Sequence, residues 1–87
     1  MLDIAKQVIE REIEGLKALE DALGEDFENA VNLILKCKGK LIVSGMGKSG
    51  HIARKIAATF ASTGTPAIFV HPAEASHGDL GMITKDD

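Results

Sequence analysis

A glycine-rich loop, GMGKSGH from Gly45 to His51, holds the residues whose types and spacing best suit chemistry. Glycines let a backbone approach a ligand closely, and the amides at a helix N-terminus attract anions. Lys48 and Ser49 add an ammonium group and a hydroxyl group to the same loop. The loop therefore predicts a site for an anionic ligand.

Two nucleotide-binding patterns overlap in this loop, and neither is complete. The triphosphate loop G-x-x-x-x-G-K-[ST] needs a glycine where this chain has Ile42. The dinucleotide pattern G-x-G-x-x-G fits locally, but the acid that would hold a ribose is missing, since Glu74 comes only after Pro72. The spacing excludes a triphosphate-binding loop and leaves dinucleotide binding as a weak alternative. A third interpretation is a glycine turn that serves only to pack a strand against a helix.

A second set of polar side chains lies in HPAEASHGDLG, residues 71–81. His71, Glu74 and His77 recur at every third residue, which in a helical turn can place them around one metal ion. Residues of these types in a short loop more often make hydrogen bonds, so both interpretations stay open.

Two amphipathic helices are expected before these loops. Apolar residues recur at helical spacing over residues 3–23 and again over residues 26–38. Asp3 is a candidate N-cap for the first helix, and Gly24 and Gly39 are natural stops.

The hydrophobic pattern after Gly39 changes to that of a strand, a helix and a second strand. Short continuous apolar runs are typical of strands that are buried on both faces. The two runs are residues 40–44 and 67–70, with a helical pattern over 49–62 between them. This order predicts a βαβ unit, whose parallel strands bring the glycine loop and residues 71–81 to the same edge of the sheet.

Two parallel strands leave open edges, so we expect the chain to be the N-terminal part of a larger α/β domain. Residues 1–39 would form its leading helices, and residues 40–87 the βαβ unit with its loops. Residues 82–84 look like the approach to a third element. The apolar stripes of the helices exceed what two strands and one helix can cover, which predicts a homo-oligomer, either a dimer or a tetramer.

Composition narrows the class of protein. The net charge is −3 and no basic stripe is present, which argues against nucleic acid as a partner. No run approaches the roughly 20 apolar residues of a membrane span, and the N-terminus lacks the pattern of a signal peptide, so we expect a cytoplasmic protein that does not bind membranes. The single cysteine, Cys37, is expected to be a buried and unreactive thiol.

The motifs GMGKSGH and STGTP, followed by VHP and HGDLG, closely resemble the sugar isomerase (SIS) domain of bacterial arabinose 5-phosphate isomerases. The resemblance covers residues 40–84. It implies a three-layer, flavodoxin-like or Rossmann-like parallel-sheet domain that assembles into tetramers. It also implies interconversion of ribulose 5-phosphate and arabinose 5-phosphate, a reaction that feeds synthesis of the lipopolysaccharide sugar Kdo or of capsule.

Residue roles follow from the resemblance by position. It implies a catalytic role for Lys48, substrate contacts for Gly64, Thr65 and His77, and metal ligation by His71. The metal would be zinc or another divalent ion, and the chemistry would not require it. Aldose–ketose isomerisation passes through an enediol, so it needs a base and a donor that stabilises the developing oxyanion.

Ser49 is a further substrate-binding candidate, chosen from loop geometry rather than from the resemblance. The family's serine-rich phosphate loop, two glutamates and a later histidine have no counterpart before Asp87, so we expect no turnover from these residues alone. The alternative is a non-catalytic SIS-type regulatory domain that senses a sugar phosphate, although no recognition helix precedes the strands.

Overall fold

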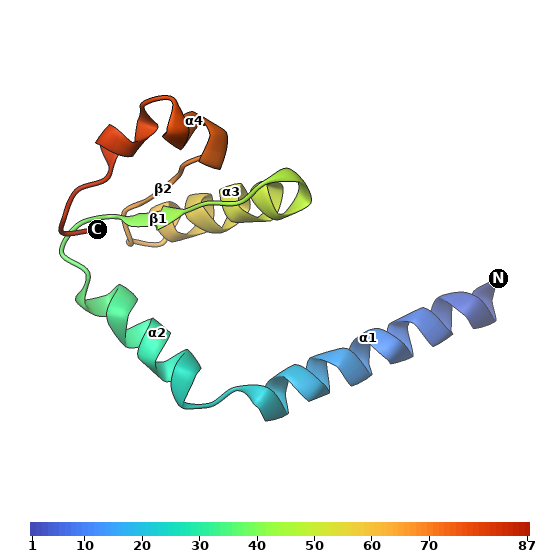
Figure 1. Ribbon diagram of the computed structural model, residues 1–87. Coiled ribbons are helices and arrows are strands. Elements are labelled where there is room, and N and C mark those ends of the chain that lie inside the picture. The colour runs from blue at the N-terminus through green and yellow to red at the C-terminus, as the bar shows by residue number, and fades with distance from the viewer. The chain divides into compact units, whose positions relative to one another are not determined.

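The computed structural model describes all residues from 1 to 87, and its elements follow the expected order (Figure 1). Two structural units, Met1–Asn32 and Leu33–Asp87, each hold together internally. The elements are α1 (Leu2–Ala22), α2 (Glu25–Lys36), β1 (Leu41–Val43), α3 (Gly47–Ser62), β2 (Ala67–Phe69), α4 (Pro72–Ser76) and the 3₁₀ helix η1 (Asp79–Met82). The predicted fold class, two leading helices and then a βαβ unit, is confirmed.

Helix α1 begins one residue earlier than expected, so Asp3 lies in its first turn and Met1 takes the N-cap position. A carboxylate in the first turn still favours the helix, because it faces the positive end of the helix dipole. The helix ends at Ala22, because the C-cap residue Leu23 has an extended backbone, and it stops before Gly24 is reached. The cap residue is therefore displaced by two positions and the stop by one, while the helix itself is confirmed.

The apolar stripe of α1 is exposed. Ile4, Val8 and Ile13 are 56%, 51% and 47% exposed, and no residue of α1 or α2 is buried. No helix has the combination of length and apolar character that crossing a membrane would require.

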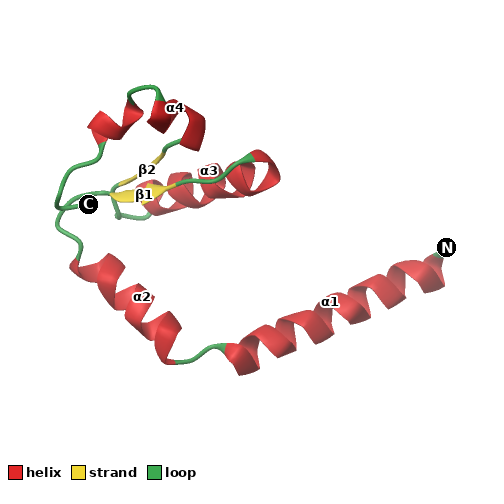
Figure 2. Ribbon diagram, viewed as in Figure 1, coloured by secondary structure: helices red, strands yellow, loops and turns green.

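A two-stranded parallel sheet and α3 form the core of the second unit (Figure 2). Leu41 pairs with Ala67, and Val43 pairs with Phe69. Helix α3 packs against both strands through Ala53 and Ala57, which are 5% and 4% exposed. Small side chains on this face of α3 let the helix lie close to the sheet.

Both strands are shorter and less buried than the sequence predicts. Each has three residues, and all six are half-buried rather than enclosed on two faces. The continuous apolar runs indicated cover on both faces, but α3 is the element that packs extensively on the strands. The expectation of full burial was wrong for this chain.

The last residues return to the beginning of β1. The Gly39 N–H donates to the Asp86 carbonyl at 3.0 Å, and the Lys40 ammonium lies 3.0 Å from the Asp87 carboxylate. Residues 83–87 follow η1, contain no strand and make this return. Cys37 lies beside it, half-buried, with its Sγ 3.4 Å from the Asp86 carbonyl, so the thiol is less enclosed than predicted.

Candidate functional site

The glycine loop connects the end of β1 to the first turn of α3. A Cβ atom on Gly50 would lie 2.6 Å from the Gly45 carbonyl oxygen, closer than real Cβ contacts allow. Gly47 adopts a φ of +58°, which favours glycine. Gly45 and Gly50 therefore serve strand-to-helix packing, as the third interpretation of the motif held, while Gly47 makes the turn into the helix.

Lys48 and Ser49 lie exposed in the first turn of α3. Together with Val43 and Ser44 they line an open depression of about 420 Å³. The first turn of α3 contains no acidic residue, so the free amides and the Lys48 ammonium leave this end of the helix positive. The arrangement suits an anionic ligand, as the sequence predicted.

Two hydrogen bonds join the chain at the carboxyl ends of β1 and β2. The Ser44 hydroxyl donates to the Val70 carbonyl at 2.5 Å, and the Val70 N–H donates to the Val43 carbonyl at 3.0 Å. The glycine loop and the segment that begins at His71 therefore meet at the carboxyl edge of the sheet. This expectation is confirmed, although sequence reasoning had not identified Ser44 as the residue that joins them.

His71 is held by two contacts. Its Nδ1 accepts a hydrogen bond from the Ala73 N–H at 3.1 Å, which caps α4, and its ring meets Phe69 edge to face, with centroids 6.4 Å apart and planes at 72°. A neutral imidazole whose Nδ1 accepts carries its proton on Nε2. In that neutral form the cap leaves Nε2–H as the remaining donor of the ring.

Metal binding does not fit this arrangement as it stands. No three His, Cys, Asp or Glu side chains of the chain are placed to hold one ion. The turn over residues 71–77 therefore does not gather His71, Glu74 and His77 into a ligand set. The Nδ1 lone pair of His71 is also already in use.

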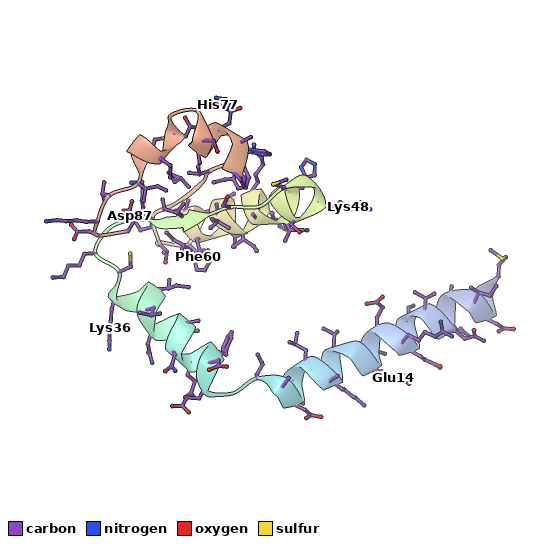
Figure 3. All side chains as sticks on the ribbon, in the orientation of Figure 1. Glu14, Lys36, Lys48, Phe60, His77 and Asp87 are labelled. Atoms are coloured by element: carbon purple, nitrogen blue, oxygen red, sulfur yellow. The ribbon has the colours of Figure 1, made fainter.

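His77 caps the C-terminal end of α4, with its backbone N–H donating to the Glu74 carbonyl at 3.0 Å. Figure 3 shows Lys48 at the beginning of α3 and His77 at the end of α4, with neither side chain pointing toward the other. The two lie in the loops of one sheet edge without touching, and His77 is exposed.

Gly64 and Thr65 lie at the other end of α3. Gly64 has a φ of +101°, and the next residues lead into the beginning of β2, where the Pro66 carbonyl accepts from the Leu41 N–H at 2.8 Å. Helix α3 has 16 residues, so about 24 Å separates its two ends. Within one chain the structure does not bring Gly64 and Thr65 to the depression beside Lys48.

A model of the SIS domain matches residues 34–87. This chain belongs to the SIS domain family. The match contains the glycine loop, both strands and the 71–81 segment.

The chain is similar in sequence to two arabinose 5-phosphate isomerases and similar in structure to a protein solved with A5P. The chain is 66% identical over 82 residues to an arabinose 5-phosphate isomerase of Yersinia pestis, covering 94% of this chain and 25% of that protein. It is 59% identical over 87 residues to an arabinose 5-phosphate isomerase of Escherichia coli K12, covering 100% of this chain and 27% of that protein. A protein of E. coli CFT073 solved in complex with A5P has the same fold, with a TM-score of 0.89 and 48% identity over 99% of this chain and 46% of that one.

The chain therefore spans about a quarter of the length of the curated relatives and under half of the solved chain.

Proposed function

We propose that this SIS domain segment belongs to an isomerase that interconverts D-ribulose 5-phosphate and D-arabinose 5-phosphate. The observation that carries the proposal is the 59–66% identity to arabinose 5-phosphate isomerases across the whole of the glycine loop and its partner segment. The positive depression at the carboxyl edge of the sheet supports it, because the substrates are anionic.

The chemistry assigns a role to each exposed polar group. Enediol formation develops negative charge on the carbonyl oxygen, which the Lys48 ammonium can stabilise. His77 is exposed, and its imidazole can hold or transfer a proton or orient a substrate hydroxyl. Ser49 supplies a hydroxyl beside Lys48 for a substrate oxygen.

Gly64 and Thr65 are proposed as substrate contacts on the strength of the resemblance alone. Their distance from Lys48 means that one chain cannot place all these residues on one small substrate, which fits a homo-oligomer. We further propose that residues 1–87 alone do not turn over substrate, that the protein acts in the cytoplasm, and that its product serves Kdo or capsule synthesis.

A metal is not part of the proposed reaction. His71 stays a proposed ligand for zinc or a similar ion, on condition that the hydrogen bond from Ala73 is given up. No catalytic step depends on it.

Isomerisation by the full-length protein tests the proposal, with Lys48→Ala compared against Lys55→Ala. Lys55 lies on the same helix but outside the depression that contains Lys48. We expect Lys48→Ala to lower kcat about a hundredfold or more, as loss of a charge-stabilising donor does, and Lys55→Ala to stay near wild type. Near-normal turnover by Lys48→Ala would refute the role of Lys48, and tight sugar-phosphate binding without any turnover by the wild type would favour the regulatory alternative.

A further inference from the structure

We propose that Arg54 is a positioning residue for His71 and that it acts through the ring of Phe69. The proposal deepens the proposed function, since it adds a residue that supports the carboxyl edge of the sheet. Only the turnover experiment depends on the proposed isomerase function; the chemical-modification experiment does not.

Arg54 has one partner, the ring of Phe69. The guanidinium carbon lies 4.2 Å from the ring centroid, well inside the distance at which a cation over an aromatic face is attracted. The only ion pair of the chain joins Lys40 and Asp87, and no hydrogen bond involves the Arg54 side chain. Helix α3 also contains no acidic residue that could compete for it.

Phe69 also contacts His71. It is the last residue of β2, and its ring meets the imidazole edge to face at a centroid distance of 6.4 Å. Paired rings prefer such an arrangement to a face-to-face sandwich. One face of Phe69 is covered by the guanidinium while the ring meets His71 edge to face, so the three side chains form one continuous series of contacts.

Phe69 also lies close to the first turn of α3. Gly50 lies one helical turn before Arg54, and a Cβ atom there would make an ordinary van der Waals contact of 3.7 Å with the tip of the Phe69 ring. The ring therefore packs against the side of α3 that presents Gly50 and Arg54.

The orientation of His71 then depends on two restraints, the Phe69 ring and the hydrogen bond from Ala73. That bond alone allows the ring to tilt about the Nδ1–N axis. Edge-on contact with a fixed Phe69 removes this freedom and holds Nε2–H in one direction. Loss of the guanidinium should loosen Phe69 and then His71, with little effect on the strands.

Site-resolved carbethoxylation of the full-length protein tests the proposal without any need for turnover. Diethyl pyrocarbonate is added, and the rate of modification of His71 and His51 is followed by peptide mass spectrometry. His51 lies exposed on α3 and serves as an internal reference. We expect Arg54→Ala to raise the rate at His71 about two- to fivefold, the factor that an exposed cation–aromatic contact is worth, and to leave His51 unchanged.

Three further variants sharpen the result. Arg54→Lys keeps the charge but not the planar stack, so it should resemble Arg54→Ala. Phe69→Leu should give the same increase, and Lys55→Ala should give none. An unchanged His71 rate in Arg54→Ala and Arg54→Lys, or an equal rise at His51 and His71, would overturn the proposal.

Turnover provides a second, separable readout. In an active protein, any loss of kcat/KM in Arg54→Ala should be absent in a His71→Ala background, because Arg54 acts through His71. An equal effect in both backgrounds would show that Arg54 does not act through His71. If the wild type proves inactive, the proposed function fails while the carbethoxylation result still decides the role of Arg54.

Discussion

At the level of single residues, the hydrogen bond from Ala73 to His71 decides what the imidazole can bind. A neutral imidazole has one N–H and one lone pair. In this structure the lone pair of Nδ1 accepts from the Ala73 N–H, which caps α4. A metal ion and the helix cap therefore compete for the same ring.

Zinc titration should reveal this competition. If His71 ligates zinc in the full-length protein, calorimetry should show binding that His71→Ala abolishes, while His51→Ala matches the wild type. Because bound zinc would need the lone pair, the Ala73 amide should exchange with solvent faster in the presence of zinc. Indistinguishable isotherms for wild type and His71→Ala would return His71 to a purely structural role as the cap of α4.

Residue types and motif positions were enough to predict part of the site. Lys48, His71 and His77 were expected to converge on one edge of the sheet. The structure places all three in the segments at that edge, because loops that follow parallel strands share an edge, but the side chains of Lys48 and His77 do not meet. The contacts of Phe69 with Arg54 and His71 were not predicted, since they depend on side chains from different elements that no local pattern records.

At the level of elements, the contact between Gly45 and Gly50 sets the distance from β1 to α3. A Cβ at Gly50 would press on the Gly45 carbonyl, which is backbone and cannot rotate away. The glycine pattern therefore reports packing as much as ligand binding. This is why G-x-G-x-x-G occurs here without a dinucleotide acid.

Gly50→Ala should consequently destabilise the second unit. Forcing an extra methyl group into a closed contact typically costs about 1–3 kcal/mol. Gly15→Ala provides the control, since a Cβ on Gly15 in the middle of α1 meets nothing within 4 Å and should stabilise the helix by about 0.5–1 kcal/mol. Chemical denaturation measures both changes, and a stability of Gly50→Ala equal to wild type would show that the loop relaxes freely.

The contacts of Asp87 with the beginning of β1 should make the free energy of unfolding depend on pH in the acid range. Backbone amides of Thr84 and Lys40 donate to the Asp87 carboxylate, and these bonds, with the Lys40 ammonium, hold its pKa well below the ordinary value of 3.8. The folded state thus prefers the ionised form, so the stabilisation is complete above pH 3.8 and is lost as the pH falls below it.

Asp87→Asn isolates this effect. The free energy of unfolding of wild type should exceed that of the variant at neutral pH, and the difference should shrink as the pH falls below 3.8. Denaturation at several pH values measures it. If the difference in free energy of unfolding stayed constant as the pH fell below 3.8, the pKa of Asp87 would be the same in the folded and unfolded chains.

The order and type of the helices and strands could be predicted because periodicity and glycine stops are local properties. Boundaries moved by one or two residues, as at α2, which ends at Lys36 rather than Lys38. Burial of the strands was not predictable from the same runs, because it depends on which elements pack on each face. The position of Gly64 and Thr65 opposite Lys48 follows from the direction of α3, which motif matching alone did not consider.

At the level of the whole molecule, the exposed apolar surface of the leading helices is the feature that demands a partner. Leu16 and Leu19 of α1 are 65% and 56% exposed, and Phe27 of α2 is 54% exposed. Burying an aliphatic or aromatic side chain is worth roughly 1.5–3 kcal/mol. Leaving the apolar stripes of α1 and α2 in water therefore forgoes a free energy of burial that is large compared with the small net stability expected of the chain.

Self-association through these helices is the outcome we predict, as a dimer or a tetramer. Sedimentation equilibrium at micromolar concentration should show a species of two or four chains. Val8→Glu, in the apolar stripe of α1, should shift it toward monomer, because a buried carboxylate without a partner is costly. Gln7→Glu adds the same charge one residue away, on the polar side of the helix, and should leave the assembly intact. A compact monomer that unfolds cooperatively, or equal dissociation by Val8→Glu and Gln7→Glu, would show that the stripes of α1 and α2 are covered within a single chain or do not form the interface.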